Sequence, residues 1–292
     1  MSDERELTPA EAAALVRVPT PDHAKYARGV LGMLTGSSRY PGAAVLGVEA
    51  ALRTGVGMVR YLGPARAADL VLQRRPEAVT APGRVQAWVI GSGMGLLSAA
   101  ADGEIEEAPE PETAERVRGA LASGHPLIID AGAIAPTVLA AARGPVIITP
   151  HAGELARLSG VDVAAVRADP GAAARAAAAR FGVAVLLKGH TTRVVAPGGP
   201  MLVARQAPTW LATAGAGDAL AGILGALTAT HAAATLAGQP VDLPQLARLG
   251  AAAAVLHGLA AARASAGGPL TVLDLCAALP ATVAALLDAA DR

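Results

Sequence analysis

The segment from Ala212 to Gly222, A-T-A-G-A-G-D-A-L-A-G, places Gly215, Gly217 and Asp218 at the start of a long apolar helix. Glycines lack Cβ atoms, so backbone N–H groups there can approach an anion, and the helix N-terminus adds partial positive charge. With Ala216, the two glycines form a candidate anion hole. Asp218 would be the base that accepts a proton from an attacking hydroxyl, an arrangement suited to phosphoryl transfer. Helix capping would explain the same residues, because Asp is favoured in a first turn.

Other polar or glycine-rich segments directly follow short apolar runs. They are T-G-S-S-R-Y-P-G-A-A from Thr35, G-S-G-M-G from Gly91, the lone Asp130, T-P-H-A-G-E from Thr149 and L-K-G-H-T-T from Leu187. In an open parallel sheet, ligands collect at the carboxyl ends of strands, where these segments would lie. The glycine run after Ile90 departs from G-x-G-x-x-G, since position 96 is Leu96, and the sequence contains no Walker A motif.

Three charged residues in these segments could act on a phosphorylated ligand. Lys188 emerges from an apolar strand and could bind phosphate. Glu154 could hold a water-ligated magnesium ion, and His151 lies three residues before it on the same helix face. A first-turn glutamate satisfying the helix dipole, beside a loop histidine, would explain this pair equally well. Asp130 could be catalytic, structural or a helix cap.

The elements that must position these residues are predicted from hydrophobic patterning. Apolar runs rich in β-branched residues predict buried strands at Val30–Leu34, Val56–Leu62, Val85–Ile90, Leu127–Ile129, Val146–Ile148 and Val183–Leu187. Helices are predicted between them at Ala43–Arg53, Ala65–Arg74, Pro111–Ala122 and Ala172–Arg180, and after Asp218 at Ala219–Ala232, Leu243–Ala262 and Thr271–Leu287. A β-hairpin is predicted for Thr192–Ala196 with Met201–Arg205. This alternation indicates one α/β domain with a mainly parallel central sheet and helices on both faces.

Composition argues against several classes of partner. Lys plus Arg and Asp plus Glu number 24 each, so no global basic field exists to hold nucleic acid or an anionic membrane. Aromatic residues make up 2% of the chain, which argues against base-stacking platforms. The charge-free stretch Ala219–Val241 is better explained as a buried helix than as a membrane span, because Ala, Gly and Thr dominate it. The single Cys276 and the acidic N-terminus, which lacks a secretory pattern, indicate a cytoplasmic protein.

In this order, six segments resemble the ADP-dependent NAD(P)H-hydrate dehydratases of the ribokinase-like superfamily. They are K-Y-A-R-G-V-L-G-M-L-T-G-S-S-R-Y-P-G-A-A from Lys25, I-G-S-G-M-G from Ile90, I-I-T-P-H-A-G-E from Ile147, L-L-K-G-H-T-T from Leu186, A-T-A-G-A-G-D-A-L-A-G from Ala212 and L-H-G-L-A from Leu256. The resemblance implies a ribokinase-like three-layer sandwich over residues 1–292, with residues 1–24 as a lead-in. Because the match begins near residue 25, we expect a stand-alone dehydratase without the epimerase domain to which the family is also fused.

The activity implied by this resemblance is a lyase reaction in nicotinamide-nucleotide repair. The S epimer of hydrated NADH or NADPH would be dehydrated while ADP is converted to AMP and phosphate, with Mg²⁺ as cofactor. Phosphorylation would turn a poor leaving group, hydroxide, into a good one. The resemblance further implies a homo-oligomer, which is a tetramer in many bacterial members.

Residue roles follow from the matching positions. Lys188, Gly189, His190, Thr191, Thr192 and Gly217 would hold the adenine nucleotide. Ala43, Gly93, His151 and Asp218 would line the hydrate pocket, with Asp218 as the catalytic base near the hydrate hydroxyl. Glu154 would help to place magnesium.

Two positions depart from the family pattern, and two alternatives remain. The family usually has D-A-D where this chain has Asp130-Ala131-Gly132, and T-G-N where Gln206-Ala207-Pro208 stands. A ribokinase-like kinase acting on a vitamin-precursor alcohol would use the same Asp218 and anion hole. A nucleotide-binding module that has lost catalysis is the other alternative, motivated by the two altered positions.

Overall fold

The fold is an α/β structure built on one mostly parallel sheet, and the computed structural model describes residues 4–95, 109–234 and 240–290. The strands of this part of the chain follow the order β1-β9-β8-β7-β6-β5-β4-β2-β3. Only the pairs that β8 makes with β7 and with β9 are antiparallel. The bounds are β1 Glu4–Glu6, β2 Val30–Leu34, β3 Met58–Tyr61, β4 Ala87–Ile90, β5 Leu127–Ile129, β6 Val146–Ile148, β7 Ala184–Leu187, β8 Thr192–Val195 and β9 Met201–Ala204. The strands and the hairpin predicted from apolar runs are confirmed.

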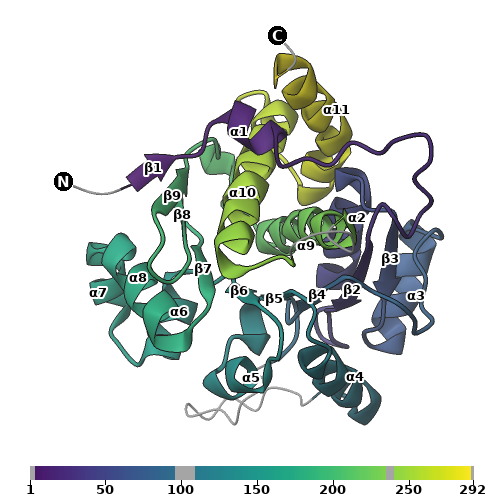
Figure 1. The fold of residues 1–292 in the computed structure, drawn as a ribbon, viewed down its shortest axis with the longest axis horizontal. Coiled ribbons are helices and arrows are strands. Elements are labelled where there is room, and N and C mark those ends of the chain that lie inside the picture. Colours follow the sequence, from purple (N-terminus) through teal and green to yellow (C-terminus); the bar gives the residue numbers. More distant parts are fainter. Residues whose placement is uncertain (1–3, 96–108, 235–239, 291–292) are drawn as a thin grey trace.

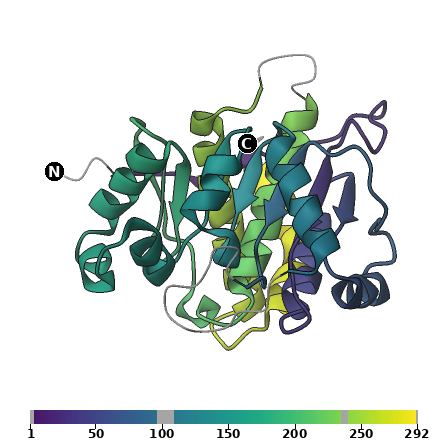
Figure 2. The ribbon, with the colours of Figure 1, turned by 90° about the horizontal axis from the view of Figure 1, so that it is seen from below.

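Helices cover both faces of this sheet, as Figures 1 and 2 show. The bounds are α1 Pro9–Ala13, α2 Gly42–Thr54, α3 Ala65–Arg74, α4 Pro111–Ala122, α5 Pro136–Ala141, α6 Ala152–Ser159, α7 Val163–Ala168, α8 Pro170–Phe181, α9 Ala216–Ala234, α10 Leu243–Ser265 and α11 Val272–Ala290. Helices α1, α2, α3, α9, α10 and α11 share one buried apolar cluster with the sheet, and α4 to α8 share the other. The predicted three-layer arrangement is therefore confirmed.

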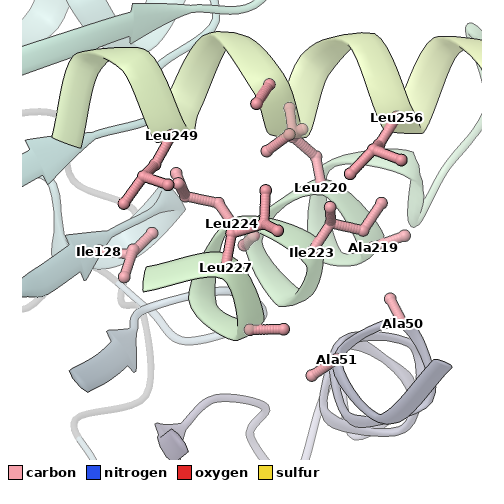
Figure 3. Close-up of a cluster of buried hydrophobic side chains, with 14 of the residues drawn as sticks. Ala50, Ala51, Ile128, Ala219, Leu220, Ile223, Leu224, Leu227, Leu249 and Leu256 are labelled. Carbon is pink, nitrogen blue, oxygen red and sulfur yellow. The ribbon is translucent and has the colours of Figure 1, made fainter. Parts of the chain in front are cut away.

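Helix α9 is the central helix of the first layer and positions the glycine-rich segment at its N-terminus. Leu220, Leu224 and Leu227 are buried in the cluster that Figure 3 shows, where α9 packs against α2 and α10. Close approach of α9 to α2 requires glycine, because a Cβ atom at Gly222 would lie 2.2 Å from the carbonyl oxygen of Gly47. The described part of the charge-free stretch is thus a core helix, while residues 235–239 of that stretch lie outside the described residues.

Two other helices are long and apolar enough to cross a membrane by length and composition. The apolar window of α10 is 78% buried inside the protein, so α10 is a core helix. The corresponding window of α11 is 33% buried. Helix α11 packs one face against α1, α2 and α10 and buries Leu275, Cys276 and Leu279 there. Cys276 is fully buried, and this burial raises the pKa of its thiol to about 12.

The first residues of the chain, which were expected to be only a lead-in, include a strand of the sheet. Strand β1 pairs in parallel with β9 and extends the sheet by one strand. Glu4 accepts a hydrogen bond from Arg193 at 2.6 Å, so charged side chains attach this edge strand to its neighbours. Its sequence, Glu-Arg-Glu, has no apolar run because the strand is half exposed at a sheet edge. Periodicity therefore offered no signal for it.

Candidate active site

One buried carboxylate joins the carboxyl ends of four adjacent strands. Asp130, directly after β5, is 2% exposed. It accepts hydrogen bonds from Ser92 Oγ at 2.7 Å and Thr149 Oγ1 at 2.6 Å, which follow β4 and β6, and from Lys188 Nζ at 3.0 Å, which follows β7. Burial alone would raise the pKa of Asp130, but the charge of Lys188 and these hydrogen bonds hold the pKa below its ordinary value. Asp130 is therefore an ionised carboxylate that positions Lys188.

Lys188 is the cation at the centre of this edge. Its ammonium lies 3.0 Å from Asp130 Oδ1 and 3.7 Å from Glu154 Oε2. Burial lowers the pKa of Lys188, whereas the negative charges of Asp130 and Glu154 raise it by a larger amount. The pKa of Lys188 therefore lies above its ordinary value. A Cβ atom at Gly217 would lie 3.4 Å from Lys188 Nζ, which places the ammonium against the first turn of α9. A permanent positive charge therefore lies beside the predicted anion hole.

The glycines before α9 allow the tight turn that the anion hole needs. Gly215 has φ +89°, and a Cβ atom there would lie 2.4 Å from Leu46 Cδ1. Helix α9 begins at Ala216, so the backbone N–H groups of Ala216 and Gly217 belong to its first turn. These amides and the Lys188 ammonium occupy the same end of the helix, as an anion site requires.

Asp218 lies in that first turn but does not act as a cap. No described residue donates a hydrogen bond to its carboxylate, and burial is the largest cause that raises its pKa to about 7. The negative charge of Asp130 raises this pKa further, whereas Lys188 lowers it. A carboxylate that is half protonated near neutral pH and free of donors can accept a proton in a reaction.

His151 and Glu154 form the N-terminal cap of α6. His151 Nδ1 accepts hydrogen bonds from the backbone nitrogens of Gly153 at 3.0 Å and Glu154 at 3.2 Å. Glu154 Oε2 in turn accepts a hydrogen bond from the backbone nitrogen of His151 at 2.7 Å. The two residues thus form a capping box, a role that the sequence had not indicated for His151. Among the described residues, no group of three or more His, Cys, Asp or Glu side chains could hold a metal ion by itself.

A cavity of about 480 Å³ opens beside Lys188 and the start of α9. Of the residues predicted to hold a nucleotide, it is lined by Lys188, Gly189, His190, Thr192 and Gly217, whereas Thr191 is not in its lining. Segments from β9 to α9 and from α10 complete the lining, with Ala204, Gln206, Ala207, Pro208, Thr209, Leu211, Ala212, Ala216, Leu220, Ala254 and His257. Sequence segments far apart in the chain therefore enclose one cavity of ligand size.

The residues predicted to line a second pocket also lie at this edge of the sheet. A Cβ atom at Gly93 would lie 2.5 Å from the Cβ atom of Ala43 and 3.3 Å from the Cα atom of Gly36. Gly93 has φ +67°, so glycine is required there both for conformation and for space. The His151 side chain, at the N-terminus of α6, is 60% exposed. Ala43 and Gly93 are thus brought together, and His151 is accessible to a ligand.

A family profile described as NAD(P)H-hydrate dehydratase matches residues 31–279. The chain belongs to this family. The bifunctional NAD(P)H-hydrate repair enzyme Nnr of Mycobacterium tuberculosis (strain CDC 1551 / Oshkosh) is 41% identical over 234 residues, which cover 75% of this chain and 45% of that protein. The chain thus spans about half the length of such bifunctional relatives. The ADP-dependent (S)-NAD(P)H-hydrate dehydratase of Xanthomonas campestris pv. campestris is 34% identical over 233 residues, 73% of this chain and 76% of that protein.

Solved structures confirm the fold. The ADP/ATP-dependent NAD(P)H-hydrate dehydratase of Bacillus subtilis, co-crystallised with ATP/Mg²⁺, superposes with a TM-score of 0.80 at 24% identity and covers 96% of this chain and 98% of that chain. A ribokinase-like superfamily protein of Enterococcus faecalis superposes with a TM-score of 0.78 at 22% identity and covers 98% and 97% of the two chains. The predicted ribokinase-like fold is confirmed by these neighbours.

The two departures from the family pattern have a visible structural setting. A Cβ atom at Gly132 would lie 2.2 Å from the carbonyl oxygen of Met94 and 2.4 Å from that of Gly95. The turn after β5 therefore has no room for an aspartate at this position. Gln206, Ala207 and Pro208 line the cavity, so the second departure lies in its wall.

Two residues of the site escaped prediction from sequence. The role of Asp130 was left open between three alternatives, and its three donors come from separate segments that only folding brings together. His257 was part of a matching motif but received no role. The signal available for it was one histidine in the apolar run of α10, where a polar side chain needs a partner.

Proposed function

We propose that this protein dehydrates the S epimer of hydrated NADH or NADPH and couples the reaction to conversion of ADP to AMP and phosphate. The observation that carries the proposal is Asp218, which no described residue hydrogen-bonds and whose pKa burial raises to about 7, beside an anion hole and Lys188. Membership of the family and the ADP-dependent activity named for the Xanthomonas relative support the choice of reaction.

In the first step of the proposed reaction, the hydroxyl of the hydrated nicotinamide ring attacks the terminal phosphoryl group of ADP. Asp218 accepts the hydroxyl proton, the new O–P bond forms and AMP leaves. The Lys188 ammonium and the amides of the first turn of α9 stabilise the charge on the transferring group. In the second step the C–O bond breaks and phosphate leaves, assisted by the ring nitrogen lone pair. Loss of a proton from the adjacent ring carbon restores the double bond.

Ligands would occupy the two regions at the carboxyl edge of the sheet. We assign the nucleotide to the cavity lined by Lys188, Gly189, His190, Thr192 and Gly217. The hydrate would bind over Ala43, Gly93 and His151, with Asp218 between the two ligands. Thr191 would contact the nucleotide through its backbone, since it precedes Thr192 in the same turn.

Mg²⁺ fits this site as a partner of the nucleotide. This ion retains several waters and binds through one or two carboxylates plus substrate phosphates, so a complete protein cage is unnecessary. Glu154, whose Oε2 lies 3.7 Å from Lys188 Nζ, is the carboxylate we assign to a magnesium-bound water. When bound, the ion would neutralise charge on the phosphates. We further propose that residues 1–292 form one domain. We also propose that the protein is a cytoplasmic homo-oligomer.

The test is an assay with hydrated NADH, Mg²⁺ and ADP, in which absorbance of the reduced nicotinamide is followed. We expect absorbance to recover while AMP appears in equal amount. Failure to recover with either ADP or ATP would refute the proposed function, and recovery with ATP alone would correct the nucleotide. A kinase would instead accumulate a phosphorylated alcohol, and a module without catalysis would bind ADP without turnover.

A further inference from the structure

Ser92 is a buried residue of the glycine-rich turn that follows β4, and it is 1% exposed. Its Oγ atom donates a hydrogen bond to Asp130 Oδ2 at 2.7 Å. Both of its neighbours have positive φ angles, +112° at Gly91 and +67° at Gly93. Two glycines give the backbone of this turn wide conformational freedom, and Ser92 carries the polar side chain between them. The hydroxyl therefore attaches an otherwise free turn to the end of the neighbouring strand.

The same turn forms part of the surface that we assign to the hydrate. The backbone nitrogen of Gly36, in the loop after β2, donates a hydrogen bond to the carbonyl oxygen of Ser92 at 2.6 Å. A Cβ atom at Gly93 would lie 2.5 Å from the Cβ atom of Ala43 and 2.9 Å from the carbonyl oxygen of Tyr40. The turn thus packs closely against the loop after β2 and the start of α2. A displacement of Gly93 would change the shape of this surface.

The two oxygens of the Asp130 carboxylate hold different parts of the site. Oδ2 accepts the hydrogen bond from Ser92, on the side of the hydrate. Oδ1 accepts from Thr149 at 2.6 Å and from Lys188 at 3.0 Å, on the side of the nucleotide. Loss of the Ser92 hydroxyl would leave both contacts of Oδ1 in place. The two sides can therefore be perturbed separately.

A hydrogen bond to a buried charged group is stronger than one between neutral groups, so its loss should loosen the turn. We propose that Ser92 is a positioning residue that fixes Gly93 through Asp130 and so shapes the surface over which the hydrated nicotinamide binds. Ser92 acts on the hydrate, whereas Lys188 acts on the nucleotide, although both donate to the same carboxylate. This inference rests on the proposed binding of the hydrate over Ala43 and Gly93.

The experiment is steady-state kinetics of the wild type, Ser92→Ala and Ser92→Cys, with hydrated NADH and ADP varied separately in the presence of Mg²⁺. Ser92→Ala should raise the KM for the hydrate on the order of 10-fold, the effect of one charge-assisted hydrogen bond. The KM for ADP should stay unchanged, because Lys188 keeps its bond to Asp130. Ser92→Cys has a similar shape and a weaker donor, so it should raise the KM for the hydrate by a smaller factor. This second variant provides the same measurement if Ser92→Ala folds poorly.

The matched control removes a buried hydroxyl outside the site. Thr228 is fully buried in α9, and its Oγ1 atom donates a hydrogen bond to the carbonyl oxygen of Leu224 at 2.8 Å. It lies about 15 Å along the helix from Asp218. Thr228→Val keeps the shape of the side chain and loses the hydroxyl. This control should lower Tm, as Ser92→Ala does, without changing either KM.

Two results would overturn the inference while leaving the proposed function intact. One is an unchanged KM for the hydrate in both Ser92 variants. The other is an equal rise in the KM for the hydrate and the KM for ADP, which would indicate a general structural effect. In both cases the wild type would still recover NADH from its hydrate. Failure of the wild type to do so would overturn the inference and the proposed function together.

Discussion

Replacing Asp218 by Asn should stabilise the folded protein, and the gain should grow with pH. Burial, followed by the charge of Asp130, raises the pKa of Asp218 from 3.8 to about 7. Between these two values the folded state binds more protons than the unfolded state, so stability falls as pH rises through this window. Above the folded-state pKa the loss is complete. Asparagine is neutral at every pH and avoids the loss.

The size of the gain follows from the pKa shift. One pKa unit corresponds to about 1.36 kcal/mol, so the rise from 3.8 to about 7 sets an upper limit of about 4 kcal/mol. The carboxylate is partly exposed, and solvent screening reduces this figure to about 2 kcal/mol at pH 8. Near pH 4 the two proteins should differ little. For a chain of 292 residues, a gain of about 2 kcal/mol corresponds to a rise in Tm of about 3 °C.

Thermal unfolding of the wild type and Asp218→Asn at pH 5 and pH 8, without nucleotide, measures this effect. The control is Asp274→Asn, since Asp274 is exposed and hydrogen bonds from Thr271 lower its pKa. That variant loses a carboxylate that stabilises the folded state, so its stability relative to the wild type should not increase as pH rises. An equal difference at both pH values, or a less stable Asp218→Asn at pH 8, would refute the reasoning.

The same variant should lose turnover by about 100-fold or more while it still binds ADP.

Three further predictions concern Lys188 and the glycines. Lys188→Met should weaken ADP binding by about 10-fold or more in calorimetry, because a charge-assisted hydrogen bond is lost; unchanged affinity would remove Lys188 from the phosphate site. Gly222→Ala should lower Tm, since its Cβ atom would lie 2.2 Å from the carbonyl oxygen of Gly47, whereas Gly119→Ala, with open space in α4, should raise stability by about 0.5–1 kcal/mol. Equal effects of the two would contradict the packing of α2 on α9. Gly132→Asp should lower Tm and leave turnover unimproved, and a stable, faster enzyme would show that the turn after β5 can open.

The strands were predictable because parallel strands buried on both faces must be apolar throughout. Two strands have the same bounds in the structure as in the prediction, namely Val30–Leu34 and Leu127–Ile129. The turn residues Pro197-Gly198-Gly199 indicated the hairpin. Strand β1 was missed for the opposite reason. It lies at the sheet edge, where Glu4 pairs with Arg193 of β8 and Glu6 with Arg205 directly after β9, and no local pattern records such partners.

Some properties of the site were likewise predictable from the sequence, and others were not. Residue types and their order determined that a base, a lysine and a glycine-rich helix start would meet, because ligand-binding segments of a parallel sheet follow its strands. Whether Asp218 caps α9 depended on which groups donate to its carboxylate, and only the tertiary structure showed that no described residue does. The same holds for Asp130, which accepts from Ser92, Thr149 and Lys188.

Sequence by itself thus determined the family, the strand that each candidate residue follows and the expected place of phosphoryl chemistry, since these depend on local patterns along the chain. The raised pKa of Asp218 and the anchoring of Lys188 were decided only by the tertiary structure. Burial and long-range hydrogen bonding set those properties, and both arise between segments far apart in sequence.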